Sequence, residues 1–430
     1  MERFLKQCTR AALGVALAAV LLAGCAGQEA GQSASAPPMS ESAAQTDGAA
    51  VEQLLDGEHL LAPVEKEYTK MPMAENKFGC YEFVGHGGGY LLCYTNYGAR
   101  TRTPLCDAAG CIHRDESCPA FSKYYRTAVV AGDWLLTEGW CEENARSLDV
   151  RRLDGTERKE LQCVDKEEDF SSFVSFAKED GKLWMPVKGK AVLLDPATGE
   201  MEEGAAMPDT FYEVGVFGSS VLLLTDDKDA LLKEYFQPTD DVETDLQSKD
   251  EILTAASAVV AAWDPRTGET VPLQSWKSTD YNLFGVWGTK IILKETRGTG
   301  LEMRDLVTGE VTALAENWPE DQSVSAAYVR DDHLMLETWW EPEPDNSDTW
   351  KECMFALDLE SGELTEVTLR SQGSDSVQLP RILGGNENEF YVLCSSPLDF
   401  ETRTCETAVI SKADFYAGVD SMVPIKDVFR

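Results

Sequence analysis

Three cysteines and a histidine form the densest group of chemically reactive side chains in this chain of 430 residues. They are Cys106, Cys111, His113 and Cys118, in the spacing Cys-x4-Cys-x-His-x4-Cys. Three thiolates and one imidazole are a ligand set that holds Zn²⁺ tetrahedrally. The spacing, however, lacks the two-residue knuckle of common zinc motifs. The residue types therefore favour a metal site, and the spacing does not.

A further cysteine, Cys25, follows a segment with the composition of an export signal. Basic residues among the first ten precede an apolar run over residues 11–22, which is too short to span a bilayer. The run leads into Leu22, Ala23, Gly24 and Cys25, which resemble the lipobox of bacterial lipoproteins. The resemblance implies that residues 1–24 are a removed signal peptide and that Cys25 is acylated, with palmitate as the expected lipid. An ordinary export signal with a chance cysteine is the alternative.

Acylation of Cys25 would anchor the protein to the extracytoplasmic face of the cell membrane, because each buried CH₂ contributes about 0.8 kcal/mol. Residues 26–50 are rich in Ala, Gly, Ser and Gln and contain few bulky side chains. Such a segment cannot bury enough apolar surface to order itself. We therefore expect residues 25–75 to form a lipidated, flexible tether in the cell envelope.

The charge balance excludes one class of partner. The formal net charge is −37, and removal of residues 1–24, which carry a net +2, leaves −39. A field of this sign repels nucleic acid, so we expect no nucleic-acid partner. We expect the membrane, through the lipid, and an unidentified protein or glycan ligand.

For the remaining cysteines we prefer disulfide bonds to metal or free thiols. Of twelve cysteines, ten remain when Cys8 leaves with the signal and Cys25 is acylated. An even number in an exported chain is typical of disulfides, whose connectivity the sequence does not give. Cys80 and Cys93 flank a glycine-rich break and are placed to bridge neighbouring strands. We thus expect no cofactor, with zinc at Cys106, Cys111, His113 and Cys118 as the less favoured alternative.

The chain repeats a tight turn of the form Asp-x-x-Thr/Ser-Gly-Glu. In such a turn Asp accepts backbone N–H groups and Gly supplies the positive φ. The four full copies begin at Asp195, Asp264, Asp305 and Asp358, with looser copies at Asp107–Gly110 and Asp154–Thr156. Apolar residues flank the copies and predict strands.

A second repeated feature is a short polar break between two apolar strands. The breaks fall near residues 88, 132, 181, 218, 288, 332 and 387, at intervals of 44, 49, 37, 70, 44 and 55. The long interval contains an acidic insertion at 226–253, and without those 28 residues it shortens to 42. Seven units of about forty residues predict seven four-stranded blades.

These turns resemble the tandem propeller repeats of exported bacterial proteins, including quinone-dependent enzymes, over residues 76–430. The resemblance implies an all-β fold, a seven-bladed β-propeller of four-stranded blades, with the acidic insertion 226–253 in the fourth blade. The tryptophan that follows the turn in quinone enzymes is missing, so their dehydrogenase chemistry is not carried over. A pair of β-sandwiches is the alternative fold.

The sequence predicts a binding or scaffold module for a protein, peptide or glycan rather than a particular reaction. No catalytic or cofactor-binding residue is predicted, because the four histidines are scattered and no catalytic motif is present. The alternative is a cell-envelope enzyme, a hydrolase or lyase, with its site in the propeller channel. Charged groups with perturbed pKa values at the channel mouth would favour that alternative.

Overall fold

The four full Asp turns join strands in the way that their composition predicts. At Asp305, one carboxylate oxygen accepts the amide N–H groups of Val307 and Thr308 at 2.8 and 2.9 Å, and Gly309 has a φ of 71°. Burial by itself would raise the pKa of Asp305, but these N–H groups stabilise the carboxylate and lower it. Each turn is therefore held by bonds within a few residues and can form locally.

The computed structural model describes most of the chain after the expected tether, all of it within the unit Gln45–Arg430. The described residues are 74–140, 146–164, 176–179, 181–208, 212–217, 220–236, 242–296, 298, 300–315, 323–340, 351–370, 379–395 and 406–429. Cys25, the signal peptide and nearly all of the tether lie outside them. Among the described helices, none is both long and apolar enough to cross a membrane.

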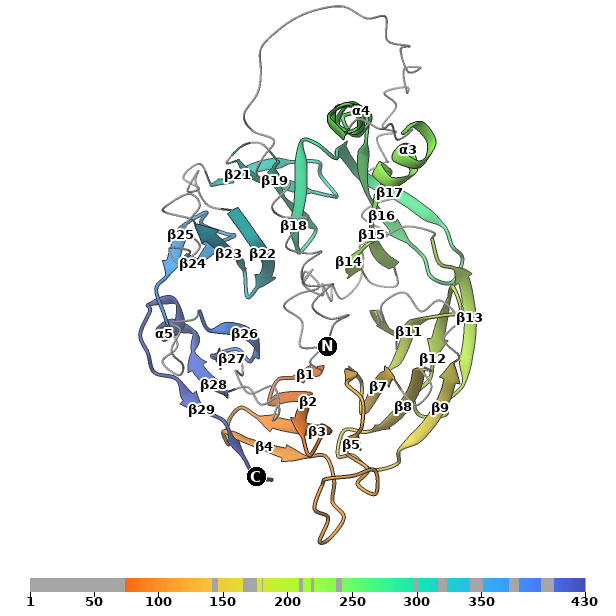
Figure 1. Ribbon diagram of the computed structural model, residues 1–430, viewed down its shortest axis with the longest axis vertical. Helices are drawn as coiled ribbons and strands as arrows, with labels where there is room; N and C mark the ends of the chain where they lie inside the picture. Colours follow the sequence, from red (N-terminus) through yellow and green to blue (C-terminus); the bar gives the residue numbers. More distant parts are fainter. Residues whose placement is uncertain are drawn as a thin grey trace, which may run out of the picture. The chain divides into compact units, whose positions relative to one another are not determined.

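The strands form seven antiparallel sheets that follow one another around a ring, with the first strand of each sheet nearest the centre (Figure 1). This is the seven-bladed β-propeller that the sequence predicts, and the alternative of two β-sandwiches is wrong. In each blade consecutive strands pair, so that every blade is a meander.

The bounds of the strands in blades one to three are as follows. Blade one contains β1 (Ala74–Asn76), β2 (Gly79–His86), β3 (Gly89–Asn96) and β4 (Thr101–Pro104), with β5 (Phe121–Ser122) added beside β3. Blade two contains β6 (Arg126–Ala131), β7 (Trp134–Trp140), β8 (Arg146–Arg152) and β9 (Lys159–Val164). Blade three contains β10 (Phe176–Glu179), β11 (Lys182–Val187), β12 (Lys190–Leu194) and β13 (Met201–Ala206).

Blades four to seven repeat this order. Blade four contains β14 (Tyr212–Phe217), β15 (Ser220–Asp226), β16 (Ser257–Trp263) and β17 (Thr270–Lys277). Blade five contains β18 (Tyr281–Trp287), β19 (Lys290–Glu295), β20 (Leu301–Asp305) and β21 (Val311–Ala315). Blade six contains β22 (Ser323–Arg330), β23 (His333–Trp340), β24 (Lys351–Asp358) and β25 (Leu364–Val367). Blade seven contains β26 (Arg381–Gly385), β27 (Glu389–Ser395), β28 (Glu406–Ser411) and β29 (Val423–Pro424).

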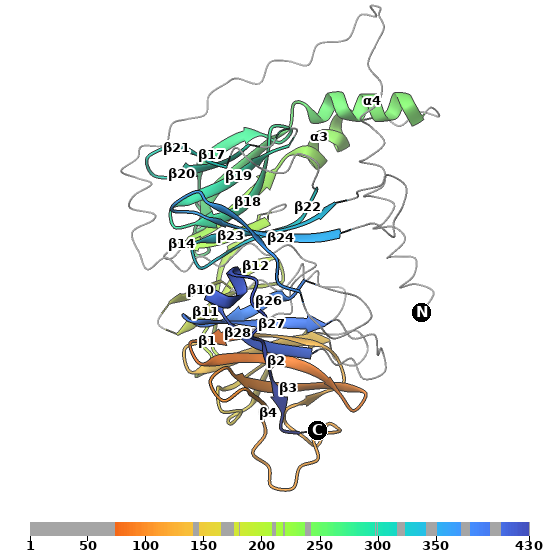
Figure 2. The ribbon, with the colours of Figure 1, turned by 90° about the vertical axis from the view of Figure 1, so that its left-hand side faces the viewer.

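Three helices interrupt the meander in the described part of the chain. The acidic insertion folds as α3 (Lys228–Tyr235) and α4 (Val242–Leu253), between β15 and β16 of blade four. The two helices lie together at the periphery of the ring (Figures 1 and 2). The short α5 (Lys412–Tyr416) follows β28, and its N-cap Ser411 accepts the amide N–H of Asp414.

Blade one departs from the expected repeat. The break at Gly88 lies between β2 and β3, whereas the later breaks fall between the first and second strands of their blades. The equivalent turn of blade one is at Lys77-Phe78, so the first interval is 132 − 78 = 54 residues. The looser copy at Asp107–Gly110 is likewise no strand turn but part of a loop. This loop lengthens blade one, and the glycine-rich β2–β3 hairpin imitates the expected break.

Each blade packs one face against the preceding blade and the other face against the following blade, through apolar side chains. Among the described residues there are seven apolar clusters, one at each blade interface. Leu136 and Met185, for example, meet between blades two and three. The cluster between blades seven and one has the fewest fully buried members, namely Cys80, Tyr97, Tyr391 and Val409.

Polar contacts around Arg102 supplement this small apolar interface. The guanidinium donates to Glu82 at 2.9 Å and to Thr95 at 3.2 Å within blade one, and to Asp427 of the C-terminal segment at 3.0 Å. It also donates to Tyr391 and Thr407 of blade seven. Arg102 is 3% exposed, so this is a buried charge whose donors are used on several strands at once.

The C-terminal segment completes the closure of the ring. Strand β30 (Lys426–Asp427) pairs in parallel with β4, the fourth strand of blade one. Glu75 of β1 accepts the Gly385 amide of blade seven across the same junction at 2.7 Å, and it accepts from Tyr97 within blade one, also at 2.7 Å. Blades one and seven are thus joined by hydrogen bonds as well as by apolar contact.

We predict that Arg102→Met destabilises the protein by about 3–5 kcal/mol, because it leaves Glu82 and Asp427 without their cation. The measurement is the free energy of unfolding in urea. Lys190→Met, which removes a solvent-exposed ion pair with Glu203, should leave the free energy of unfolding nearly unchanged. Equal losses in the two variants would contradict the role assigned to Arg102.

Candidate metal centre

A loop over residues 105–120 leaves blade one after β4 and returns to it before β5. Its two ends meet at one residue of β3: Leu105 donates its amide N–H to the Leu92 carbonyl at 2.9 Å, and the Leu92 amide donates to Ala120 at 2.8 Å. The loop therefore closes on itself at the base. It extends beyond the outer strands of the blade (Figure 1).

The loop brings together all four residues that the sequence singled out. The thiols of Cys106, Cys111 and Cys118 and an imidazole nitrogen of His113 all lie within 4.8 Å of one another. The shortest described approach is 3.3 Å, between His113 Nδ1 and Cys118 Sγ. Zn–S bonds of about 2.3 Å imply sulfur–sulfur distances of roughly 3.8 Å in a tetrahedron. The four donor atoms are thus close to the size of a one-metal site.

Within the loop, the candidate ligands are shielded from solvent and the residues between them are exposed. Of residues 106–117, nine are exposed, and the three that are not are Cys106, Cys111 and His113. Cys118, the fourth, is buried. Ile112, the apolar residue between two of the ligands, is 68% exposed. The loop therefore turns inward at the ligand positions rather than at apolar ones.

The thiols differ in acidity. The amide N–H of His113 donates to Cys111 and lowers the pKa of that thiol, which favours the thiolate. Burial raises the pKa of Cys118 to about 12, so its thiol stays protonated at neutral pH unless a cation displaces the proton. His113 itself has a φ of 54°, in the left-handed region that few residues other than glycine adopt.

The preferred disulfides are absent from the described cysteines. None of the seven cysteines with described side chains is joined in a disulfide; they are Cys80, Cys93, Cys106, Cys111, Cys118, Cys353 and Cys394. The bridge expected between Cys80 and Cys93 is not formed, because the strand register places Cys80 opposite Thr95 and Cys93 opposite Glu82. Cys141 and Cys405, and the side chain of Cys163, lie outside the described part.

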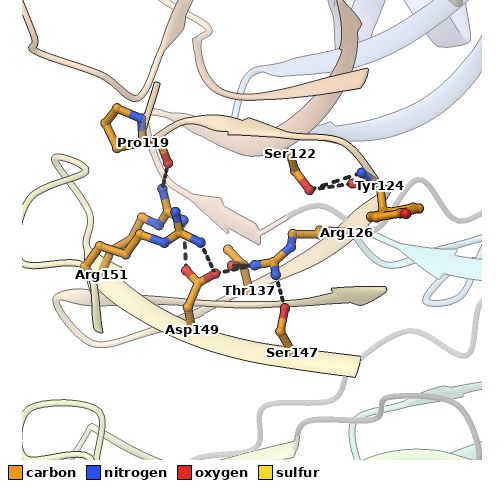
Figure 3. Close-up of polar contacts among 9 residues, drawn as sticks. Pro119, Ser122, Tyr124, Arg126, Thr137, Ser147, Asp149 and Arg151 are labelled. Atoms are coloured by element: carbon orange, nitrogen blue, oxygen red, sulfur yellow. Dashed lines mark hydrogen bonds and ion pairs between the residues drawn. The ribbon is translucent and has the colours of Figure 1, made fainter. Parts of the chain in front are cut away.

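A buried polar network of blade two holds the end of the loop. Arg151 donates to the carbonyl of Pro119, the residue after Cys118, at 2.7 Å, and to Asp149 at 2.8 Å. Arg126 reaches the same carboxylate from the opposite side (Figure 3). Arg158 is a third cation, 3.2 Å from Asp149. One carboxylate thus orients the guanidinium that fixes the loop.

This network was missed from the sequence. Its one local signal is the spacing of Asp149 and Arg151, which places both on one face of a strand, alternating with the apolar Leu148 and Val150. Arg126 lies 23 positions before Asp149, and no local pattern connects the two. The third contact, to Pro119, depends on how blades one and two pack.

Comparisons with known proteins bear on the fold. No family model matches the chain, and no curated protein is similar to it in sequence. A prolyl endopeptidase structure superimposes with a TM-score of 0.52 at 10% identity, covering 89% of this chain and 52% of the endopeptidase. This chain therefore spans about half the length of that enzyme.

Two further structures resemble the chain less closely. The β-propeller domain of the Trilobed protease from Pyrococcus furiosus gives a TM-score of 0.47 at 12% identity, covering 83% of this chain and 95% of the domain. Oligogalacturonate lyase from Vibrio parahaemolyticus gives 0.43 at 12% identity, covering 69% and 74%. At these identities the likeness concerns the fold alone.

We predict that Asp149→Asn destabilises the protein by about 3–5 kcal/mol at pH 7, because three guanidinium groups lose their shared anion. Burial alone would raise the pKa of Asp149, but Arg151, Arg158 and Arg126 outweigh burial and lower it. The stabilisation is therefore complete above the unfolded pKa of about 3.9 and is lost as the pH falls through the lowered folded value.

Urea unfolding between pH 7 and pH 2 measures both effects. The wild type should lose stability more steeply below about pH 4 than Asp149→Asn does. The control is Asp154→Asn, an exposed carboxylate that caps a turn through Thr156. If the two variants have the same stability at pH 7, Asp149 has no special role.

Proposed function

We propose that this protein is a membrane-anchored, extracytoplasmic β-propeller lipoprotein that acts as a binding or scaffold module. Its anchor is the lipid on Cys25, and its ligand is a protein, peptide or glycan of the cell envelope. The observation that carries the proposal is the two-helix insertion of blade four. Loops and insertions on a rigid scaffold are where binding function concentrates.

The insertion is strongly acidic. Residues 226–253 contain ten Asp or Glu and three Lys, a net charge of −7. Two of the lysines are engaged within the insertion: Lys228 pairs with Asp226 at 2.9 Å, and the Lys249 ammonium lies 4.5 Å from the centre of the Phe236 ring. Of the carboxylates whose side chains are described, Glu234 and Glu251 are exposed, and so is Tyr235, at 52%. A protein with a basic surface is the partner that this chemistry favours.

Glu337 supports the second candidate function, a hydrolase or lyase. The Glu337 side chain, on β23, is 9% exposed, and Nε of Arg381 in blade seven lies 3.9 Å from its carboxylate oxygen Oε2. Burial raises its pKa, which is the property of a general acid. Among the described Asp and Glu residues it is the one with a raised pKa. A single such carboxyl is a weaker argument than the insertion, because glycoside hydrolysis, for example, uses a pair.

We expect Cys25→Ser to abolish both acylation and membrane retention, because the thiol is the site of the lipid. The measurement is labelling of cells with a fatty-acid analogue, followed by membrane fractionation. Cys8→Ser, which changes a cysteine within the signal peptide, should keep both. Retention of label and membrane association in Cys25→Ser would contradict the anchor.

We expect neutralisation of the insertion to weaken partner binding. The variant carries Glu234→Gln, Asp245→Asn and Glu251→Gln. The partner is identified by cross-linking in intact cells, and its affinity for the purified protein is then measured at several salt concentrations. If each of the three lost charge pairs contributes about 0.5 kcal/mol to binding, the affinity for the partner should fall roughly tenfold. The affinity of the variant should also depend less steeply on salt concentration.

The matched control removes the same charge from three exposed strand turns, with Glu200→Gln, Glu269→Gln and Glu310→Gln, and should bind as the wild type does. An equal loss of affinity in both variants would show a general effect of charge and would contradict a specific role for the insertion. Turnover of a glycan or peptide that disappears in Glu337→Gln would favour the enzyme instead.

A further inference from the structure

We propose that Cys106, Cys111, His113 and Cys118 bind one Zn²⁺ ion as a closed structural site that holds the 105–120 loop against blade one. The proposal is independent of the function proposed above. It reverses the preference for disulfides that the sequence alone suggested, and the geometry of the loop is the reason.

The size of the donor set indicates a single metal ion. Three sulfurs and one nitrogen within 4.8 Å of one another leave room for one cation between them. Soft thiolates with an imidazole in tetrahedral geometry select zinc among the abundant divalent metals. Four protein ligands fill the tetrahedron and leave no position for water or substrate, so the site is structural rather than catalytic.

The loop lacks the apolar contacts that order a segment of this length. Between Leu105 and Cys118 every residue except the ligands is exposed. Ordering the backbone costs about 1–2 kcal/mol per residue, and residues that stay exposed bury too little surface to offset that cost. A metal ion can, because the free energy of binding to such ligands becomes free energy of folding.

A disulfide satisfies this loop less well than a metal does. Three thiols surround one imidazole, so any bridge within the group leaves one thiol unpaired. The imidazole nitrogen Nδ1 of His113 also lies 3.3 Å from the sulfur of Cys118. A disulfide would not involve the imidazole. Zinc uses all four groups.

The site lies beside the closure of the ring. Strand β4, which pairs with β30, ends at Pro104, two residues before the first ligand. Cys106, Cys111 and Phe429 pack against the same apolar cluster of blade one. A loop held by zinc therefore restrains the strand on which the C-terminal segment is paired. We infer that loss of the metal loosens β30 as well as the loop.

The first test is the metal content of the full-length protein, purified in detergent under reducing conditions. We expect one zinc per chain, replaceable by one Co²⁺ with the absorption spectrum of a tetrahedral, thiolate-rich site. Cys106→Ser, Cys111→Ser, Cys118→Ser and His113→Ala should each lose the bound metal or its spectrum. Cys353→Ser and Cys394→Ser, which change free thiols elsewhere, should keep both.

The second test uses the wild type and needs no variant to fold. Arg114 is exposed and lies between two ligands, so trypsin reports on the order of the loop. A chelator should accelerate cleavage after Arg114 about tenfold, as expected when a held segment opens. Hydrogen exchange should also speed up at the amides of Lys426 and Val428, which donate to the backbone carbonyls of Arg100 and Arg102. The β12–β13 hairpin of blade three should not change.

Several results would overturn the proposal. They are the absence of stoichiometric metal, stoichiometric iron or copper in place of zinc, and a disulfide within the loop found by mass spectrometry of protein trapped from cells. Metal loss in Cys353→Ser equal to that in Cys106→Ser would do the same. If the chelator changes the loop but not β30, the structural site stands and its coupling to ring closure is wrong.

Discussion

The whole fold depends on the contact that closes the ring, between the first and seventh blades. The other six interfaces join blades that follow one another in the chain. This one joins residues such as Glu82 and Tyr391, which are 309 positions apart and 2.9 Å from each other. Loop-closure entropy grows only slowly with length, so the added cost of so distant a contact is modest. The contact is stabilised by a small apolar cluster and by the hydrogen bonds that Arg102 donates to blade seven.

Each of the first two blades contains a buried charge network, but the balance of charges is opposite in the two. In blade one, a single cation, Arg102, serves two anions, whereas in blade two a single anion, Asp149, serves three cations. Both arrangements act on the cysteine loop. Arg102 fixes the strand from which the loop starts, and Arg151 fixes the carbonyl of Pro119 at its end. The loop is therefore positioned at its base by two charge networks, while in its middle Cys106, Cys111 and His113 are the residues turned away from solvent.

What the sequence could predict was what forms locally. The Asp turns, the number of blades and the place of the acidic insertion follow from patterns a few residues long, and the structure confirms the propeller. The break at Gly88 was assigned to the wrong pair of strands, because a hairpin between the second and third strands has the same composition as one between the first and second. The networks of Arg102 and Asp149 could not be predicted, since their members meet only when blades pack. Cys106, Cys111, His113 and Cys118 lie within thirteen residues, so the sequence could single them out as a group, and the structure brings them together. Their exposure pattern, which favours metal over disulfides, required the structure.

The distribution of charge also explains how a ring of open-edged sheets avoids pairing with its neighbours. The fourth strand of each blade presents an unpaired edge, which is a template for another strand. Glu202 and Glu203 are exposed on β13, and Glu366 on β25. Among the described residues, the buried arginines Arg102, Arg126 and Arg151 are balanced by the buried acids Glu82, Glu138, Asp149 and Glu337, so the excess negative charge of this part lies on the surface. Edge-to-edge association then brings like charges together and is disfavoured. Blade one, by contrast, has its edge strand β4 covered by β30, so the C-terminal segment both closes the ring and shields this edge.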